Sequence, residues 1–285
     1  MTQLEYGVSR PVLRYHGGKW LLAPWIISHF PEHEVYVEPF AGAGSVLLRK
    51  PRSFCEVYND LDGEVVNLFR VLRAREDCLR LCDMLERTTF GRMDFEQAYE
   101  QTKDGVEQAR RMIVRSFQGF GSGSYNRDYS TGFRAASKQT GRPHAMDWVN
   151  IPECLWLVTE RLKGVVIECR DAFECIRQQD DLQTIFYVDP PYLSSTRPHS
   201  NRKQYRFELG TSDHVALAKL LHEVKGKVIL SGYPSELYDG LYEGWHRVSK
   251  VAQAGGQCGR VQRTEVLWMN FNRQGPASQG QKEGE

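Results

Sequence analysis

Short runs of apolar, β-branched and aromatic residues recur along the chain and predict buried strands. Several runs have apolar residues at consecutive positions, as expected of strands covered on both faces. Helical patterns lie between most of them, for example at 61–73 and 213–225, with Ser212 or Asp213 as the expected cap of the second. This alternation favours a doubly wound α/β fold with a seven-stranded, mostly parallel sheet. The predicted strands are 35–38, 54–58, 165–169, 184–188, 228–231, 245–249 and 264–271.

One long interval, 74–150, interrupts the alternation. It holds helical patterns but no pattern of a buried strand, and 119–141 within it is rich in Gly, Ser, Asn and Tyr. A stretch of this length without core strands predicts an inserted subdomain or a functional loop. We therefore expect one domain formed by 1–73 and 151–273, interrupted by the insert, and a disordered tail at 274–285.

Composition narrows the class of protein only a little. The 285 residues are 41% hydrophobic and 26% charged, and the net charge of +1 does not by itself indicate a nucleic-acid partner. The N-terminus lacks the apolar core of a signal peptide, and no apolar stretch is long enough to span a bilayer. We expect a cytoplasmic protein without a membrane partner. Seven cysteines without a Cys-x-x-Cys pair predict free thiols and no metal site.

The segment 35–45, with the sequence VYVEPFAGAGS, predicts a strand, a glycine turn and a helix. Gly42 and Gly44 allow the backbone to approach a ligand closely, because no Cβ intervenes. A dinucleotide fingerprint needs a third glycine where Leu47 stands, and no Gly-Lys-Ser/Thr triphosphate loop follows. Glu38 would repel a pyrophosphate at this strand end. It suits the ammonium and sulfonium charges of S-adenosylmethionine, which carries no phosphate.

Asp60 follows the next predicted strand. A carboxylate at that position is suited to accept both hydroxyls of a ribose. Each feature alone has a simpler explanation, since two glycines can form a tight turn and Asp60 can cap a helix. The combination with Glu38 at successive strand ends favours a ligand site.

A second glycine pair stands near the N-terminus, in YHGGK at 15–19. Gly17 and Gly18 precede a helical pattern at 21–30, so their backbone N–H groups are expected to face an anion such as a carboxylate. Lys19 adds a positive charge. The alternative is a plain surface turn with a solvated lysine.

The run 184–192, TIFYVDPPY, is the most specific feature of the sequence. The amino group of adenine is a poor nucleophile, because its lone pair is delocalised into the ring. Two acceptors for its N–H bonds, the Asp189 carboxylate and the Pro190 carbonyl, make that lone pair available, and Pro191 helps to fix the carbonyl. Tyr192 offers a face on which a flipped base stacks. The run predicts methyl transfer to an amine, against the alternative of a structural Pro-Pro stop.

In their order and spacing, these motifs resemble those of the alpha-class, Dam-like DNA adenine-N6 methyltransferases. The resemblance covers most of 11–271 outside the insert, and it rests on YHGGK at 15–19, EPFAGAGS at 38–45, Asp60 and DPPY at 189–192. It implies a Rossmann-like S-adenosylmethionine-dependent methyltransferase fold, with the insert as target-recognition domain. It also implies that the partner is double-stranded DNA and that the protein associates with the nucleoid. We expect a monomer in solution, with a dimer on DNA as the alternative.

The resemblance also implies two sets of site residues. The catalytic set is Asp189, Pro190, Pro191 and Tyr192. The cofactor set is Tyr15, Gly17, Gly18, Lys19, Glu38, Pro39, Phe40, Gly42, Gly44, Ser45, Asp60, Asp171, Ala172 and Asp189. For Asp171, matched to the acid at the cofactor's adenine, an ordinary helix cap is the alternative.

Two basic segments are candidates for contact with DNA. Between 108 and 142, seven basic residues face one acid, with aromatic residues interleaved, and a second cluster follows the catalytic run at 197–206. A solvated basic surface is the alternative for both. The candidate contacts are Arg115, Tyr125, Asn126, Arg127, Arg134, Lys138, Arg197, Arg202, Lys203 and Arg206.

The sequence leaves the target open. Members of the family that modify GATC carry a Tyr-Asn-x-Arg-Gly-x-Phe-Asn-type hairpin, from which SYNRDYS at 124–130 departs in part. One alternative function is methylation of cytosine N4 by the same two acceptors. A second is an inactive DNA-binding protein on the same fold, which the intact Asp189, Gly42 and Asp60 disfavour. A third is a protein-glutamine methyltransferase, where Asn usually replaces the acid.

Overall fold

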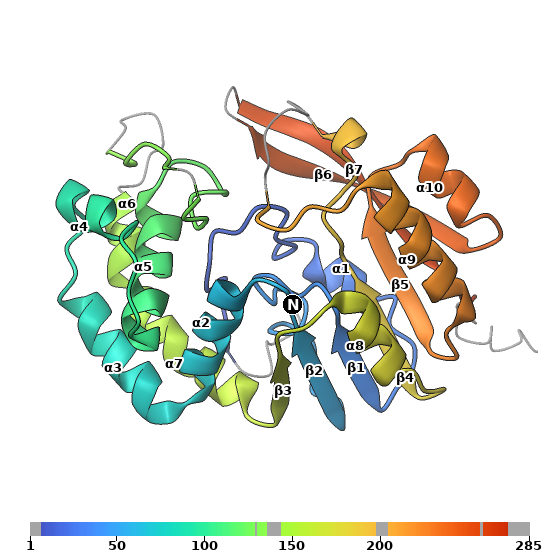
Figure 1. Cartoon of the computed structure of the whole chain (residues 1–285), viewed down its shortest axis with the longest axis horizontal. Helices are drawn as coiled ribbons and strands as arrows, with labels where there is room; N and C mark the ends of the chain where they lie inside the picture. The colour runs from blue at the N-terminus through green and yellow to red at the C-terminus, as the bar shows by residue number, and fades with distance from the viewer. Residues whose placement is uncertain (1–6, 129, 136–143, 198–204, 257–258, 273–285) are drawn as a thin grey trace, which may run out of the picture.

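The structure, a computed structural model, describes residues 7–128, 130–135, 144–197, 205–256 and 259–272. Within these residues, seven strands form one sheet in the order β3-β2-β1-β4-β5-β7-β6. The first five strands of this order are parallel. β7 pairs antiparallel with β5, and β6 pairs antiparallel with β7 (Figure 1). The predicted mostly parallel, seven-stranded sheet is confirmed. The strands are β1 (Val35–Glu38), β2 (Cys55–Asn59), β3 (Val165–Glu168), β4 (Thr184–Val188), β5 (Lys227–Gly232), β6 (His246–Gly256) and β7 (Gly259–Met269).

The strand boundaries agree best in the centre of the sheet. β1 and β4 coincide with their predicted ranges, and the ends of β2, β3 and β5 differ by one residue. The edge hairpin is much longer than predicted, since β6 and β7 pair from His246 opposite Met269 to Gly256 opposite Gly259. Its outer part, where Val251 is 62% exposed, lacks the apolar run that marks a buried strand.

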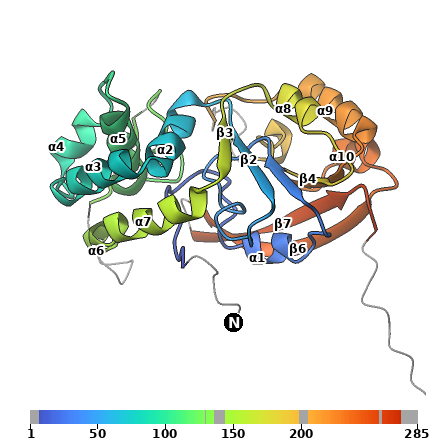
Figure 2. The same ribbon diagram turned by 90° about the horizontal axis from the view of Figure 1, so that it is seen from below.

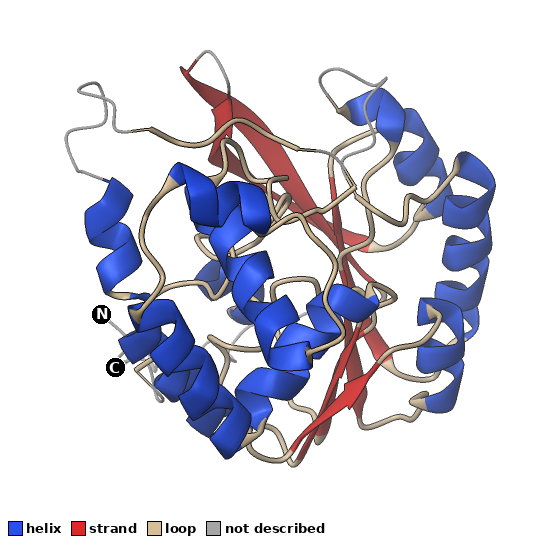
Figure 3. Cartoon of the chain, turned by 60° about the vertical axis from the view of Figure 1, so that its left-hand side comes forward, coloured by secondary structure: helices blue, strands red, loops and turns tan. Residues whose placement is uncertain are grey.

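Two hydrophobic cores cover the two faces of the sheet. Alternate strand residues point to opposite faces, so Tyr36, Ile185 and Tyr187 enter one core while Val37 and Phe186 enter the other. The second core is closed by α8 (Ala172–Gln178), α9 (Thr211–Glu223) and α10 (Glu236–Leu241). Figure 2 shows these helices on one side of the sheet, with α1 (Ala23–Ile27) on the other, and Figure 3 shows helices on both sides of the strands.

The first core continues into a helical lobe, which we define as α2 to α7 and which lies on the left of Figure 1. Its central helices cross-pack, since α2 and α3 both contact α5 and α7. The expected insert, 74–150, therefore shares a core with the helices that flank it, and its division from the rest remains a prediction. The lobe consists of α2 (Gly63–Arg73), α3 (Arg75–Glu86), α4 (Arg92–Gln97), α5 (Gly105–Gln118), α6 (His144–Val149) and α7 (Ile151–Leu162).

Two helix predictions need correction at their ends. The cap of α9 is Gly210, not Ser212 or Asp213, because the Asp213 carboxylate accepts the Gly210 N–H at 2.8 Å from inside the first turn. α1 is shorter than the predicted 21–30, because turns precede and follow it. None of the helices in the described ranges is both long and apolar enough to cross a membrane.

Candidate active site

A pocket opens beyond the carboxyl ends of β1, β2 and β4, where open α/β sheets bind ligands. It encloses about 950 Å³ of empty space, part of it open to solvent. Its walls come from segments as distant in sequence as Tyr15 and Leu209. The residues of the expected cofactor set that line it are Tyr15, Gly17, Gly18, Lys19, Glu38, Pro39, Phe40, Gly42, Ser45, Asp60, Asp171, Ala172 and Asp189.

The two glycines after β1 have different surroundings. Both adopt left-handed backbone angles, with φ of 48° at Gly42 and 60° at Gly44. A Cβ at Gly42 would lie 2.7 Å from Cε1 of Tyr15, so the missing side chain lets that ring close against the pocket. A Cβ at Gly44 would instead meet the ring of Phe69 at 3.1 Å. Gly44 does not line the pocket and is better explained by packing than by a ligand.

Asp60 fastens the glycine turn to the end of β2. Its Oδ2 accepts the Gly42 N–H and its Oδ1 accepts the Asp62 N–H, both at 2.8 Å. Burial raises the pKa of Asp60 to about 6, although these two backbone bonds oppose the shift. Each carboxylate oxygen keeps a second lone pair, so this clamp is compatible with acceptance of ribose hydroxyls.

Glu38 is a second buried acid in the pocket, with 2% of its surface exposed. Its Oε1 accepts the Leu47 N–H at 2.7 Å and the hydroxyl of Tyr36. Burial raises the pKa of Glu38 to about 7, and the hydrogen bonds from Tyr36 and Leu47 oppose this. A cationic ligand beside Glu38 would favour its ionised form.

Two further observations bear on whether the pocket suits S-adenosylmethionine. Ser45 Oγ is buried in the pocket wall and has no hydrogen-bond partner among the described residues, as expected of a group that awaits a polar ligand. Asp171 caps α8 by accepting the N–H groups of Phe173 and Glu174, and it lines the pocket as well. The donor and acceptor set therefore fits a nucleoside with a cationic amino-acid tail.

Asp189, directly after β4, is held through both carboxylate oxygens. Oδ2 accepts a hydrogen bond from Lys19 Nζ at 2.9 Å, and Oδ1 accepts one from Ser231 Oγ at 2.7 Å. Ser231 ends the predicted run 228–231 and was not singled out from the sequence. A small polar residue at the end of a buried strand beside β4 was the available signal.

Lys19 lies inside the site rather than at its surface. Only 5% of it is exposed, and Nζ also donates to the Gly17 carbonyl at 2.7 Å. Burial alone would lower the pKa of Lys19, but the charges of Asp189 and then Glu265 raise it above its ordinary value. Its ammonium serves Asp189 in this structure, whereas the sequence suggested a free charge for a carboxylate ligand.

Tyr192 and Glu265 form a second buried pair next to Asp189. The Tyr192 hydroxyl donates to Glu265 Oε1, and Lys19 Nζ lies 4.7 Å from the centre of the Tyr192 ring. Pro191 lines the pocket, but Tyr192 and Pro190 do not. Glu265 was missed in the sequence, although a lone acid in the apolar run 264–271 was a usable signal.

The segment that follows the catalytic run covers the pocket. Tyr205, Arg206, Phe207 and Leu209 contribute to its wall. Arg206 ties this segment to the lobe, since it lies 3.0 Å from Asp62 and 3.3 Å from Asp128, counted between side-chain N and O atoms. Arg206, which the sequence suggested as a DNA contact, therefore also holds this segment of the pocket wall to the lobe.

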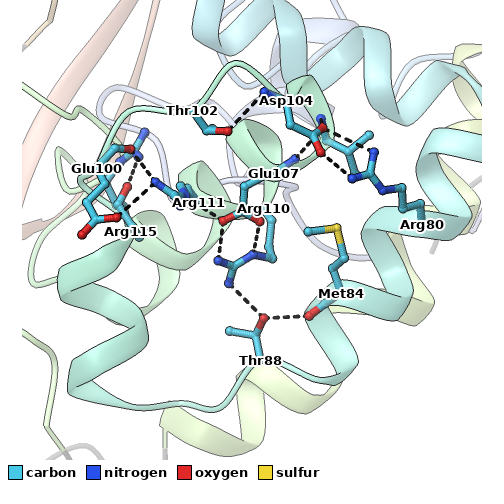
Figure 4. A network of polar contacts seen from close by, with 12 residues as sticks. Arg80, Met84, Thr88, Glu100, Thr102, Asp104, Glu107, Arg110, Arg111 and Arg115 are labelled. Carbon is cyan, nitrogen blue, oxygen red and sulfur yellow. Dashed lines mark hydrogen bonds and ion pairs between the residues drawn. The ribbon is translucent and has the colours of Figure 1, made fainter.

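Three arginines of the first basic segment are paired within the lobe (Figure 4). Arg110 and Arg111 each bind Glu107 at 2.6 Å, an acid that lies just outside the counted window. Arg115 is 1% exposed and bonds to the carbonyls of Tyr125 and Ala98 and to Glu64. Its burial argues against the direct DNA contact expected of Arg115.

Among the other candidates, Tyr125 and Asn126 are buried, and Tyr125 stacks on Tyr15 at 4.3 Å between ring centres. Arg197 is held by Glu208 at 2.6 Å and donates to the Tyr192 carbonyl. Arg127 is partly exposed and pairs with Glu64 at 2.9 Å; Arg134 is partly exposed. The candidates that lie outside the described residues are Lys138, Arg202 and Lys203.

Comparisons with known proteins show the family to which the chain belongs. The family model of the D12 class N6 adenine-specific DNA methyltransferases matches residues 15–254. The chain is 25% identical to the type II methyltransferase M.MjaIII of Methanocaldococcus jannaschii, over 92% of this chain and 99% of that protein. It is 24% identical to the DNA adenine methylase of Escherichia coli K12, over 82% and 84%. It is also 24% identical to the type II methyltransferase M1.LlaDCHI of Lactococcus lactis, over 92% and 95%.

Proposed function

Because the chain belongs to the D12 class of N6-adenine-specific DNA methyltransferases, we propose that its pocket binds S-adenosylmethionine and presents Asp189 to the amino group of a flipped adenine. The observation that supports this most directly is the position of Asp189. It lies in the wall of the same pocket as Gly42 and Asp60, and two hydrogen bonds fix its carboxylate. The methyl donor and the adenine amino group would therefore meet at one edge of the sheet.

S-adenosylmethionine supplies an electrophilic methyl group when bound. Glu38 would hold its ammonium and Asp60 its ribose hydroxyls, since both are buried acids in the pocket wall. Ser45 Oγ has an unused bonding capacity for a polar group. Gly17 and Gly18 line the pocket, but the Gly18 N–H donates to the Tyr15 carbonyl at 3.2 Å and is not left for an anion. The segment 205–209 would exclude water from the reacting atoms.

Asp189 and the Pro190 carbonyl would accept the two N–H bonds of the adenine amino group, so that its lone pair points to the methyl group. Lys19 and Ser231 keep the carboxylate in one orientation. The positive charge of Lys19 also compensates the negative charge of the Asp189 carboxylate. The proton that the methylated amine must lose is acidic and can leave to water.

DNA would contact the protein through partly exposed arginines. Arg127, Arg134 and Arg206 are the described candidates with partly exposed side chains. Arg127 pairs with Glu64, and Arg206 pairs with Asp62, which lines the pocket. DNA phosphates would compete with these acids for the two arginines. We extend the proposal to the insert 74–150 as target-recognition region, to double-stranded DNA, and to a cytoplasmic monomer associated with the nucleoid.

One incubation tests this function. The protein is mixed with DNA and S-adenosylmethionine, and the DNA is then digested to nucleosides for mass spectrometry. We expect N6-methyladenine, and sequencing of the modified DNA gives the target. N4-methylcytosine would transfer the proposal to the other amino-methylation reaction. Absence of any methylated nucleoside across a range of salt concentrations would reject it and favour an inactive DNA-binding protein.

A further inference from the structure

One buried carboxylate of the site has no part in the chemistry described so far. Glu265 lies on β7, opposite Lys250 of β6, and only 4% of it is exposed. Because strand side chains alternate, Glu265 shares a sheet face with Leu267, which belongs to the core that contains Tyr187. A buried acid in such surroundings is costly unless other groups compensate its charge. Its partners therefore indicate what it does.

Those partners are two members of the proposed site. Glu265 Oε1 accepts the hydroxyl of Tyr192 and lies 3.9 Å from Lys19 Nζ. The same ammonium is 2.9 Å from Asp189 Oδ2 and 4.7 Å from the centre of the Tyr192 ring. One lysine thus lies among the ring and two carboxylates. The hydroxyl of Tyr192 would be buried without an acceptor if Glu265 were absent.

The short covalent link between Asp189 and Tyr192 gives this arrangement a consequence. Only Pro190 and Pro191 separate the two residues, and both have fixed φ angles. A displacement of the Tyr192 ring would therefore be passed on to the Pro190 carbonyl and the Asp189 carboxylate. The carbonyl of Tyr192 is held separately by Arg197 at 2.6 Å, so the residue is anchored at both ends.

We propose that Glu265 is a positioning residue for methyl transfer, which anchors the Tyr192 hydroxyl and serves as second carboxylate neighbour of Lys19. It acts through these residues and touches no reacting atom. The inference rests on the proposed function, because it takes Asp189 and the Pro190 carbonyl as the groups that hold the adenine amino group. Its alternative is a purely stabilising role, in which Glu265 only satisfies a buried hydroxyl.

Glu265→Gln and Tyr192→Phe separate these roles. Glutamine keeps the shape and an acceptor oxygen but carries no charge, so it weakens the bond to the Tyr192 hydroxyl and removes the negative charge beside Lys19. Glu56→Gln is the matched control, because Glu56 is 3% exposed, binds Lys50 and Arg161 at 2.6 Å, and does not line the pocket. It reports the effect of removing a buried, paired carboxylate elsewhere in the sheet.

The first measurement is the single-turnover rate of methyl transfer, with the dissociation constant of S-adenosylmethionine from calorimetry. We expect Glu265→Gln to slow transfer about tenfold or more, with cofactor affinity changed less than about threefold. The double variant with Tyr192→Phe should be no slower than the slower single variant. Glu56→Gln should lower the melting temperature and leave the rate within about twofold. A Glu265→Gln rate near wild type, a loss explained by cofactor binding, or losses that multiply would overturn the proposal.

The second measurement needs no turnover. Tyrosine ring ¹³C–¹H signals of the free protein are recorded, and Tyr192 is assigned from its loss in Tyr192→Phe. We expect Glu265→Gln to shift or broaden the Tyr192 signals and Glu56→Gln to leave them unchanged. Unmoved Tyr192 signals would overturn the proposal even if activity falls. If the signals move but wild-type protein methylates no adenine, the proposed function fails while the anchoring role stands.

Discussion

The ammonium of Lys19 lies 2.9 Å from Oδ2 of Asp189, although the two residues are 170 positions apart in the chain. The contact joins the N-terminal glycine pair to the catalytic run. It also makes the acid of that run part of a buried ion pair, held from its other side by Ser231. Removal of Lys19 would deprive Asp189 of this positive charge, whereas removal of Asp189 would leave Lys19 with Glu265 at 3.9 Å.

Asp189→Asn should therefore lower the rate of adenine methylation about a hundredfold or more, because its amide turns a donor toward Lys19 or Ser231 and loses an acceptor. DNA affinity should stay within about threefold, since Asp189 faces the pocket. Nucleoside mass spectrometry and fluorescence anisotropy check the two halves. Ser231→Ala, which removes one of the two bonds that hold the carboxylate, should give a smaller loss. Equal losses in rate and DNA affinity would contradict this assignment.

Cofactor binding should weaken as the pH falls. Burial raises the pKa of Glu38 to about 7 and that of Asp60 to about 6, so both lose their charge between pH 8 and pH 5.5. Their ionised forms are the ones that attract an ammonium and accept ribose hydroxyls. We expect the dissociation constant of S-adenosylmethionine to rise about tenfold over this range, measured by calorimetry. An unchanged constant would mean that these acids do not contact the ligand.

The stability of the ligand-free protein should depend on pH in the opposite sense, with a larger contribution from these acids at low pH. A carboxyl group whose folded pKa is raised binds protons more tightly when folded, so its contribution to stability falls as pH rises from about 4.5 to about 7. Glu38→Gln should then increase the free energy of unfolding by about 1–3 kcal/mol at pH 8, and by less at pH 5. Urea denaturation at the two pH values measures this. The same gain at both would show that charge burial is not its cause.

Gly42→Ala should weaken cofactor binding and destabilise the fold by about 1–3 kcal/mol. A Cβ there would lie 2.7 Å from the Tyr15 ring, on a backbone with φ of 48°. The matched control is Gly121→Ala, where φ is 86° but nothing lies within 4 Å of the added carbon. Both variants are compared by calorimetry and thermal unfolding. We expect the control to show backbone strain without loss of cofactor affinity, and a similar loss in both would contradict a role for Gly42 in the pocket.

Arg115 and Arg127 should separate stability from DNA binding. Arg115→Ala should cost about 3–5 kcal/mol of stability, because Glu64 and two buried carbonyls lose their donor. Arg127→Ala should cost little stability but weaken DNA binding and reduce the salt dependence by about one ion. Denaturant unfolding and binding titrations at several salt concentrations measure both. Normal stability of Arg115→Ala with weakened DNA binding would reverse the two assignments.

The elements and the pocket set were largely predictable because their signals are local. β1 is a short apolar run that ends at Glu38, and β4 is an apolar run that Asp189 follows directly. Because the two strands are parallel, both acids lie at the same edge of the sheet. The glycine turn also carries its own signature. Gly44 shows the limit of this reasoning, since only the fold reveals that it faces Phe69 and not the pocket.

Charge partners were not predictable, because they are set by tertiary contacts. The count of charged residues in 108–142 did not include Glu107, which lies one position earlier. Nothing in the sequence indicated that Glu64, 51 positions before Arg115, would be the partner of that arginine. Those two acids bind four arginines that looked free along the sequence. The pairing of Glu265 with Tyr192 has the same origin, since β7 pairs antiparallel with β5 and brings the acid to the segment that follows β4.

The stacked rings of Tyr15 and Tyr125 join the pocket wall to the loop of the lobe that leads to Arg127. If a ligand in the pocket restrains Tyr15 and thereby Tyr125, thermodynamic linkage requires that restraint of Tyr125 favours the ligand to the same degree. If a ligand in the pocket raises the affinity of the lobe for its partner, the bound partner raises the affinity of the pocket for the ligand by the same factor. We therefore expect any coupling between ligand binding in the pocket and partner binding at the lobe to pass through this aromatic contact.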